Sequence, residues 1–473
     1  MRVNLISRSL FIIVIPIAIS ILFFFEQIFY AGDVIFEKID DRLSACTTSE
    51  RGVVSGNIVY DFECTSLAYL NEFVISEGHN AVLNLFGEGL IKVEINEINN
   101  SLNTIKSSKL NLLFELDNPV PKSFTDGYGF SNKEAEIVTL ATHDYEPGWY
   151  EIVTEDSHGK HYHLVFFIES SERSNVLFVE STDTLIAYNE TFRNTGIPNN
   201  YKRSVTQKTK RKGTFPKYVP VEHKITPSKF YPVRCNAHLI SADIVLKQYL
   251  QKNGISFTEV SDSQLDIPIT YENVDTIIFG AHNEYWTKEK IKLLSAFVEH
   301  GGKLLFLGGN QAYREIIRHE NYWMIRNDNF KTDEQAFTSI SQLMGTFFEG
   351  DMGTSAPLRV FNSETWQREF GIDNVNNDIF GDGSDFSYCN APYNFNPIGF
   401  MHGASSIETD QLIGGVNGFH LLAKGMQQNG GADIVYKEFK GGGKLLNLSS
   451  VGLWHSLSDP YISELITRFM QKN

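Results

Sequence analysis

Two short polar segments follow apolar runs of the chain and carry residue types that could do chemistry. Residues 281–286, Ala-His-Asn-Glu-Tyr-Trp, follow the run 276–280, and residues 308–314, Gly-Gly-Asn-Gln-Ala-Tyr-Arg, follow a second run. His282 and Glu284 are two residues apart on a chain that leaves a strand, so both side chains are expected on one side. An imidazole can shuttle a proton near neutral pH, and a carboxylate can activate water or bind a metal ion. These two segments are therefore where chemistry is expected.

A purely structural interpretation of the first segment stays open. In that interpretation Glu284 bonds backbone amides as a cap, while Tyr285 and Trp286 fill the space between a helix and a sheet. Covalent catalysis is not indicated, because the sequence has neither a Gly-x-Cys-x-Gly nor a Gly-x-Ser-x-Gly elbow. Gly-Gly-Asn at 308–310 stands where such an elbow would be expected.

The two segments together resemble the catalytic domain of the N,N-dimethylformamidase large (beta) subunit family. The shared pattern is Gly-Ala-His-Asn-Glu-Tyr-Trp-Thr at 280–287, a helix, and His-Gly-Gly-Lys-Leu-Leu-Phe-Leu-Gly-Gly-Asn-Gln-Ala-Tyr-Arg at 300–314. Two further segments are similar, Thr-Leu-Ile-Ala-Tyr-Asn at 184–189 and the glycine-rich segment that ends in Leu-Trp at 441–454. The resemblance covers about 171–473 and, more weakly, the segment before it.

The resemblance implies mononuclear iron (Fe3+) held by two tyrosinates and a glutamate. Glu284 is then the carboxylate ligand, and His282 is its acid–base neighbour. Tyr188 is the first tyrosine and Tyr231 the second, with Tyr201 as an alternative. A hard ferric ion favours such anionic oxygen donors, and it would polarise an amide carbonyl for attack by water. The resemblance also implies a class I glutamine amidotransferase-like fold without its cysteine nucleophile.

The elements of segment 171–473 fit a sheet that would position these residues. Apolar strands alternate with helical segments, which predicts parallel pairing, right-handed crossovers and a doubly wound, flavodoxin-like α/β domain. In such a sheet the reactive groups gather beyond the carboxyl ends of the strands. Strands are expected at 176–179, 256–260, 276–280, 303–307 and 441–448, and helices at 241–253, 287–299 and 460–470.

The segment 33–170 consists of short apolar runs with turn signals between them. Apolar and polar residues alternate at 92–95, a period of two that is typical of a strand with one buried face. A closing hairpin is expected over 148–168, with its turn at 156–159. Strands repeated at about 8–12-residue spacing predict an immunoglobulin-like β-sandwich.

The first residues combine basic side chains with an apolar run. Arg2 and Arg8 precede an uncharged and largely apolar segment at 10–25. We expect residues 1–32 to form a transmembrane signal anchor, because no clean small-residue cleavage site follows; a cleaved signal peptide stays open. The positive-inside rule then places the body outside the cytoplasm, in the periplasm or at the cell surface, as a single-pass membrane protein.

Composition limits the function classes. The 473 residues carry 41 Lys and Arg against 57 Asp and Glu, a formal net charge of −16. Such a chain is a poor partner for nucleic acid, which is bound by clustered Lys and Arg. Four Cys exclude a disulfide scaffold. Cys46 and Cys64 could still pair in an oxidising compartment, or stay as two buried thiols.

Two functions remain after these exclusions. The first is a metal-dependent hydrolase of a small amide, held to the membrane by the N-terminal helix. The second is a non-catalytic cell-envelope protein that uses the same fold as a binding or assembly module, for example for glycans. The partner is therefore a small-molecule amide or a glycan rather than nucleic acid, and a homo-oligomer is left open.

Overall fold

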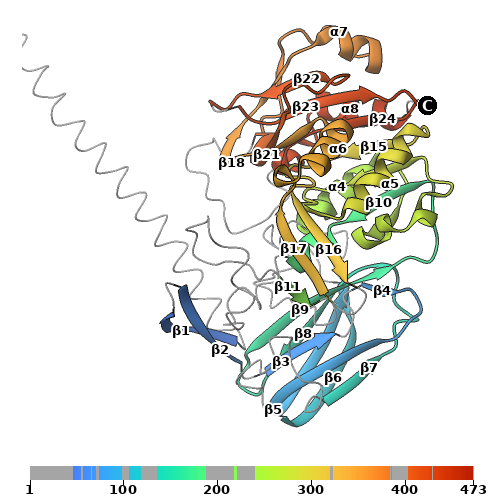
Figure 1. Cartoon of the computed structure of the whole chain (residues 1–473). Coiled ribbons are helices and arrows are strands. Elements are labelled where there is room, and N and C mark those ends of the chain that lie inside the picture. Colours follow the sequence, from blue (N-terminus) through green and yellow to red (C-terminus); the bar gives the residue numbers. More distant parts are fainter. Residues whose placement is uncertain are drawn as a thin grey trace, which may run out of the picture.

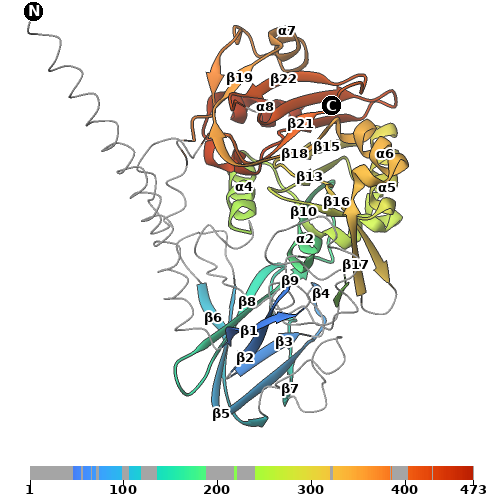
Figure 2. The same ribbon diagram turned by 60° about the vertical axis from the view of Figure 1, so that its left-hand side comes forward.

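The strands of this protein fall into two main groups. Figures 1 and 2 both show the N-terminal strands below a larger sheet that carries helices on its two faces. The structure, a computed structural model, describes residues 46–54, 57–64, 66–70, 74–97, 106–118, 136–187, 218–220, 240–319, 323–383, 385, 403–428 and 430–471.

The N-terminal strands form one seven-stranded sheet organised around the long strand β5. The first half of β5 pairs with β3 and β7, and the second half pairs with β6 and β8. A strand shared in this way joins all the partners into one continuously paired sheet, and the expected immunoglobulin-like sandwich stays a prediction. The strands are β3 (Ser66–Leu70), β4 (Val74–Ser76), β5 (Ala81–Glu97), β6 (Lys106–Asn118), β7 (Glu136–Leu140), β8 (Gly148–Glu155) and β9 (His161–Glu169).

Local predictions for this sheet are confirmed. Ile91, Val93 and Ile95 alternate into its core, as the period of two indicates. β8 and β9 form the expected hairpin, in which Oδ1 of Asp156 accepts hydrogen bonds from the backbone N–H groups of residues 158 and 160, both at 2.9 Å. A separate antiparallel pair, β1 (Cys46–Val54) and β2 (Asn57–Cys64), places Cys46 opposite Cys64, and their disulfide stays a prediction.

The large sheet has nine strands, and one half of it is parallel as expected. The parallel strands run in the order β12-β10-β13-β15-β24. α4 lies between β10 and β12, α5 lies between β13 and β15, and α8 follows β24. Thr287 caps α5 by accepting from the N–H of Lys290. These elements are β10 (Val176–Glu180), β12 (Thr258–Ser261), β13 (Thr276–Phe279), β15 (Lys303–Phe306), β24 (Lys444–Asn447), α4 (Ile240–Lys252), α5 (Lys288–Glu299) and α8 (Pro460–Gln471).

The other half of the large sheet is antiparallel, so the predicted flavodoxin-like α/β class is wrong. β24 continues into β23, β22, β19 and β20, all antiparallel to their neighbours. Only residues 439–443 connect β23 to β24, whereas a parallel crossover needs a dozen residues or more. The described chain is mostly β, with several sheets and few helices. The added strands are β19 (Leu358–Val360), β20 (Ile379–Phe380), β22 (His420–Gly425) and β23 (Asp433–Glu438).

Two small sheets, which the sequence analysis did not predict, attach to the large one. One has the order β11-β17-β16-β14 and the other pairs β18 with β21. Their strands are β11 (Tyr218–Pro220), β14 (Tyr285–Trp286), β16 (Arg314–His319), β17 (Trp323–Asn329), β18 (Thr346–Ala356) and β21 (Ser405–Leu412). The remaining helices are α2 (Thr182–Ala187), α6 (Glu334–Met344), α7 (Ser363–Thr365) and the short turns Asp262–Asp266, Pro268–Tyr271, Phe330–Thr332, Trp366–Phe370 and Val451–Ser456.

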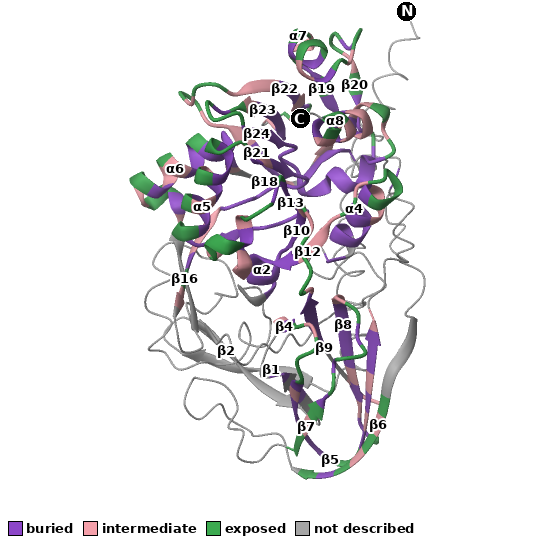
Figure 3. Ribbon diagram, turned by 90° about the vertical axis from the view of Figure 1, so that its right-hand side faces the viewer, coloured by how far each residue is buried: buried purple, intermediate pink, exposed green. Residues whose placement is uncertain are grey.

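The core lies on both faces of the large sheet. Ile278 and Leu305 point to the face covered by α4 and α8, while Ile277 and Leu304 point to the face covered by α5 and α6. Figure 3 shows these helix pairs on opposite sides of buried strands. Burial on both faces explains why the parallel strands read as continuous apolar runs.

The expected membrane topology is also corrected. In the part of the chain that the structure describes, no helix is long and apolar enough to cross a membrane. The apolar run at 10–25, which carried the expectation of a single-pass anchor, lies outside those residues.

Candidate active site

Three neighbouring parallel strands, β13, β15 and β24, end at the same edge of the large sheet. β15 pairs with both of the others, so the segments that follow the three strands lie side by side. Gly308 permits a close approach, because a Cβ at this position would lie 1.9 Å from the carbonyl oxygen of Ala281. Asn310 and Ser449 then turn the chain with φ values of 49° and 57°, which Asn tolerates better than most residues. Polar side chains of three segments therefore meet at one place.

His282 is buried at this edge, and its Nε2 atom lies between two carboxylates. Nε2 is 3.7 Å from Oε2 of Glu284 and 3.4 Å from Oε2 of Glu408. Nδ2 of Asn310 lies 3.3 Å from the same nitrogen and donates to Oε2 of Glu408 at 2.9 Å. The amide nitrogen can only donate, whereas the two ring nitrogens donate or accept according to the tautomer of the imidazole. Nε2 is the ring nitrogen of His282 that faces the carboxyl groups.

Burial sets the charge of both His282 and Glu408. It lowers the pKa of His282, and the carboxylate of Glu284 opposes this effect only in part, so the imidazole is neutral at neutral pH. Burial raises the pKa of Glu408, and the hydrogen bond from Asn310 opposes that rise. Glu408 therefore holds a proton more readily than an exposed glutamate does.

Sequence reasoning missed Glu408 and a second acidic residue, Asp410, which both lie on β21. Oδ1 of Asp410 accepts from the backbone N–H of Asn310 at 2.8 Å. Burial raises the pKa of Asp410 to about 8, although backbone N–H groups of Asn310 and Gln311 oppose this. The one available signal was the spacing of two acidic residues on one face of a segment with small polar neighbours.

Glu284 is held by its backbone and its side chain. Its N–H donates to Oγ1 of Thr184 at 3.0 Å, which ties the residue to α2. Its Oε1 accepts from Nε of Arg314 at 3.1 Å, and its carbonyl oxygen accepts from the N–H of the same arginine at 2.9 Å. The structure thus brings together two of the residues that the sequence analysis singled out, His282 and Glu284, in one buried cluster.

The expected tyrosine ligands are not tested by these contacts. Tyr188, Tyr231 and the alternative Tyr201 lie outside the described residues, and α2 ends at Ala187, directly before Tyr188 in the sequence. Among the residues that are described, no group of three or more His, Cys, Asp or Glu could hold a metal ion.

The packing interpretation of the first segment applies to only part of it. Trp286 is buried and stacks on Phe279 with ring centroids 5.1 Å apart, and Tyr285 is buried beside it. Trp286 belongs to the core between the sheet and α5. His282 and Glu284, in contrast, contact charged and amide side chains rather than serving as a helix cap. Within residues 282–286, His282 and Glu284 therefore make polar contacts, whereas Tyr285 and Trp286 are buried aromatic residues.

The model of one protein family matches residues 134–461, which is more than half of the chain. This family is described as "N,N-dimethylformamidase beta subunit-like, C-terminal". The chain belongs to this family. The resemblance inferred from the two polar segments is therefore confirmed, and both segments lie inside the matched region.

Comparison with solved structures gives only distant similarities. The chain is similar to the mmIFT52 N-terminal domain, with 14% identity, a TM-score of 0.28, and coverage of 48% of this chain and 87% of that one. It is also similar to a putative ThuA-like protein from Bacteroides uniformis, with 13% identity, a TM-score of 0.30, and coverage of 48% and 84%. No curated protein matches the sequence.

Proposed function

We propose that this protein hydrolyses the C–N bond of a small amide at the buried cluster around His282 and Glu284. The family supports an amidase-related function in general terms. One observation carries the more specific proposal: Nε2 of a neutral histidine lies between the carboxyl groups of Glu284 and Glu408, 3.7 and 3.4 Å away, at the carboxyl edge of parallel strands. This is the place where such sheets carry their reactive groups.

Of the described residues, only Glu284 is a proposed ligand, because no group of three or more His, Cys, Asp or Glu among them could hold a metal ion. Glu284 is buried and paired with Arg314, and the carboxyl groups of Glu408 and Asp410 are buried nearby. Two further buried oxygens, Oδ1 of Asn310 and Oδ2 of Asp410, have no hydrogen-bond partner among those residues. A ferric ion would be held by Glu284 with Tyr188 and Tyr231 as the phenolate donors. When bound, such an ion supplies Lewis acidity that polarises an amide carbonyl.

The chain's own residues would move the protons of the reaction. In hydrolysis, water adds to the carbonyl carbon, the C–N bond breaks, and the nitrogen gains a proton. Nε2 of His282 accepts the proton of the water and can return it to the leaving nitrogen. Nδ2 of Asn310 keeps this imidazole and Glu408 aligned, and Glu408, whose pKa burial raises, would donate to the developing charge on the substrate when it carries a proton.

The experiment compares the purified full chain with its Glu284→Gln variant. We expect the wild type to contain iron, to show a visible tyrosinate-to-iron absorption band, and to release amine from N,N-dimethylformamide or another small amide. Glu284→Gln should lose both the band and the hydrolysis. Glu315→Gln is the matched control, because Glu315 is on the same strand as Arg314 and its contact is with Lys288 at 3.4 Å.

Two outcomes would contradict the proposal. A colourless, metal-free wild-type preparation that stays folded and hydrolyses no small amide would favour a non-catalytic binding role instead. Full iron content in the Glu284→Gln variant would remove Glu284 from the set of ligands.

A further inference from the structure

Glu284 is attached to two elements that come from distant parts of the chain. Oγ1 of Thr184 on α2 accepts its N–H at 3.0 Å, and Arg314, the first residue of β16, binds its side chain at 3.1 Å. The direction of the carboxylate therefore depends on how α2 and β16 lie relative to each other. A shift of either element would move one attachment and not the other.

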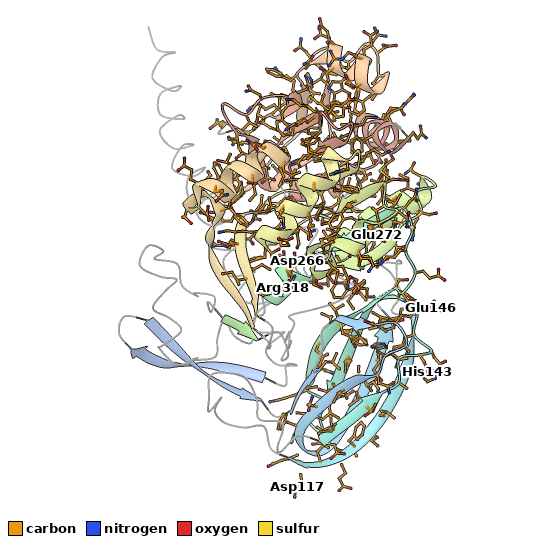
Figure 4. The ribbon with its side chains drawn as sticks, turned by 45° about the vertical axis from the view of Figure 1, so that its right-hand side comes forward. Asp117, His143, Glu146, Asp266, Glu272 and Arg318 are labelled. Atoms are coloured by element: carbon orange, nitrogen blue, oxygen red, sulfur yellow. The ribbon has the colours of Figure 1, made fainter. Side chains whose placement is uncertain are left out.

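A single arginine joins these two elements. Arg318 is four residues after Arg314 on β16, and the pairing of the strand is irregular between Arg314 and Ile316. Its NH2 group donates to Oδ2 of Asp183, the residue directly before Thr184, and its Nε donates to Oδ2 of Asp266 at 2.8 Å. In Figure 4 the labelled side chains of Arg318 and Asp266 lie next to each other at the lower end of the large sheet.

Asp183 also belongs to a charge cluster that is closed to water. Nζ of Lys290 is 3.3 Å from Oδ2 of Asp183 and 3.0 Å from Oδ1 of Asp262, and the relative exposure of these side chains is 0–1%. The N–H of Asp183 donates to Asp262 at 3.1 Å. Burial acts to raise the pKa of Asp183, but Arg318 and Lys290 hold it below its ordinary value, so it stays charged.

Such a cluster contributes little to stability, because desolvation offsets most of the attraction between buried charges. The cluster instead fixes orientation, because a planar guanidinium that binds two carboxylates has one favourable orientation. A buried network of this kind fixes geometry where an apolar contact would tolerate sliding.

We infer that Arg318 and Asp183 are a positioning pair that fixes the Glu284 carboxylate by clamping α2 onto β16. The role of Glu284 itself rests on the proposed function, but the clamp between the two elements does not. Arg318 touches neither substrate nor reacting atoms in this arrangement, and it acts through Thr184 and Arg314.

The test uses three variants of the full chain. Arg318→Met removes both carboxylate contacts and keeps the length of the stem, while Arg318→Lys keeps the charge but cannot bind two carboxylates in the same fork. Arg368→Met is the matched control, because Arg368 forms an ion pair at 2.6 Å on a segment that is far along the chain from the clamp. Amide hydrogen exchange is followed in 182–187 and 280–287, together with the melting temperature, iron content, kcat and KM.

For Arg318→Met we expect exchange in both segments to rise by about tenfold or more, with no comparable change in β5–β9. The kcat/KM for the amide should fall about 10- to 100-fold, mainly through kcat. This is the typical effect of changing a residue that orients a metal ligand. Arg318→Lys should recover part of both effects, and Arg368→Met should match the wild type. If Arg318→Met does not fold, Arg318→Lys and Asp183→Asn are compared with the wild type instead.

Unchanged exchange in both segments would overturn the clamp, and so would an equal loss of protection throughout the chain. The failures of the two proposals can be separated. If the wild type hydrolyses no amide, the proposed function fails, while the exchange comparison still decides the clamp. If the wild type is active and Arg318→Met keeps both its activity and its exchange pattern, the clamp alone fails.

Discussion

At the scale of residues, the candidate site combines a neutral imidazole with carboxyl groups of two different environments. Glu284 is paired with a permanently charged guanidinium, whereas the carboxyl of Glu408 accepts from the uncharged amide of Asn310. Burial without a charged hydrogen-bond partner raises the pKa of a carboxyl group, as it does for Glu408. In the proposed function Glu284 binds the cation and Glu408 donates a proton.

The first prediction concerns Glu408. We expect Glu408→Gln to lower kcat for amide hydrolysis by about 10²–10⁴-fold, the usual contribution of a general acid or base. Iron content should not change, because Glu408 is not among the proposed ligands. Steady-state kinetics and metal analysis of the same preparation check both parts. The exposed Glu364→Gln serves as the control; an iron-depleted Glu408→Gln protein would instead make Glu408 a ligand.

The second prediction concerns the pH dependence of stability through Asp410. Burial raises its pKa to about 8 in the folded chain, from an ordinary value of 3.8. The folded state therefore binds the extra proton between these two values, so stability falls as pH rises from about 4 towards 8. Asp410→Asn mimics the protonated form, and we expect it to flatten this slope. Urea unfolding at pH 5 and pH 8 measures it, and an unchanged slope would contradict the assignment.

The position of residues 281–286 after an apolar run, together with the family resemblance, led to this pair from the sequence. Glu408 and Asp410 could not be found in the same way, because Ser-Ser-Ile-Glu-Thr-Asp-Gln-Leu shows no apolar alternation. Their burial comes from contacts with segments far away in the chain, such as Asn310. Apart from the spacing of the two acidic residues, the burial of this polar strand leaves no local signal, because it depends on tertiary context.

At the scale of elements, the close approach of the segments that follow β13 and β15 is what gathers the site. Gly308 makes this close approach possible, since an added Cβ would lie 1.9 Å from the carbonyl oxygen of Ala281. The backbone at this contact cannot move without displacing His282, the next residue. The Gly-Gly at 308–309, where the sequence analysis looked for a nucleophile elbow, is therefore required for packing. No nucleophile is needed to explain these glycines.

The third prediction tests this contact. We expect Gly308→Ala to lower the free energy of unfolding by about 1–3 kcal/mol, the typical cost of overpacking, and to reduce activity together with stability. Gly414→Ala is the matched control, because nothing lies within 4 Å of a Cβ there and its φ is not in the left-handed region. Urea denaturation of both variants gives the comparison. Equal stabilities of the two variants would argue against a tight approach.

Some elements of the large sheet could be predicted from the sequence, and others could not. The buried parallel strands β10, β13 and β15 carry continuous apolar runs, and α5 has a clear cap and periodicity. The antiparallel strands β19, β20 and β22 are short, and β19 and β22 mix polar with apolar residues. Their place in the sheet depends on pairing with β23 and β24, which only the folded chain provides.

At the scale of the whole molecule, the N-terminal sheet and the large sheet share buried polar contacts. Nε1 of Trp149 on β8 donates to Oε2 of Glu180 on β10 at 2.8 Å, and Oε1 of Glu169 on β9 accepts from the N–H of Ser261 at 2.9 Å. Lys247 on α4 pairs with the other oxygen of Glu180 at 2.6 Å. These contacts connect the two sheets into one unit.

The fourth prediction follows from this connection. Trp149→Phe keeps an aromatic ring and removes the donor, so we expect a loss of about 1–3 kcal/mol, as for a buried acceptor that loses a partner. The two sheets should then unfold at separate denaturant concentrations. Trp366→Phe removes a similar buried donor, to Leu422 O at 2.9 Å, within the large sheet alone. It should lower stability without dividing the transition; a single transition in both variants would contradict the prediction.

The order of strands in the large sheet has a consequence for synthesis on the ribosome. β24 occupies the position between β15 and β23, although both neighbours leave the ribosome before it does. Until residues 444–447 emerge, the nascent chain keeps an unpaired edge of apolar strands exposed. Such an edge is a site of misassociation for nascent chains, and a chaperone that covers it would raise the yield of folded protein.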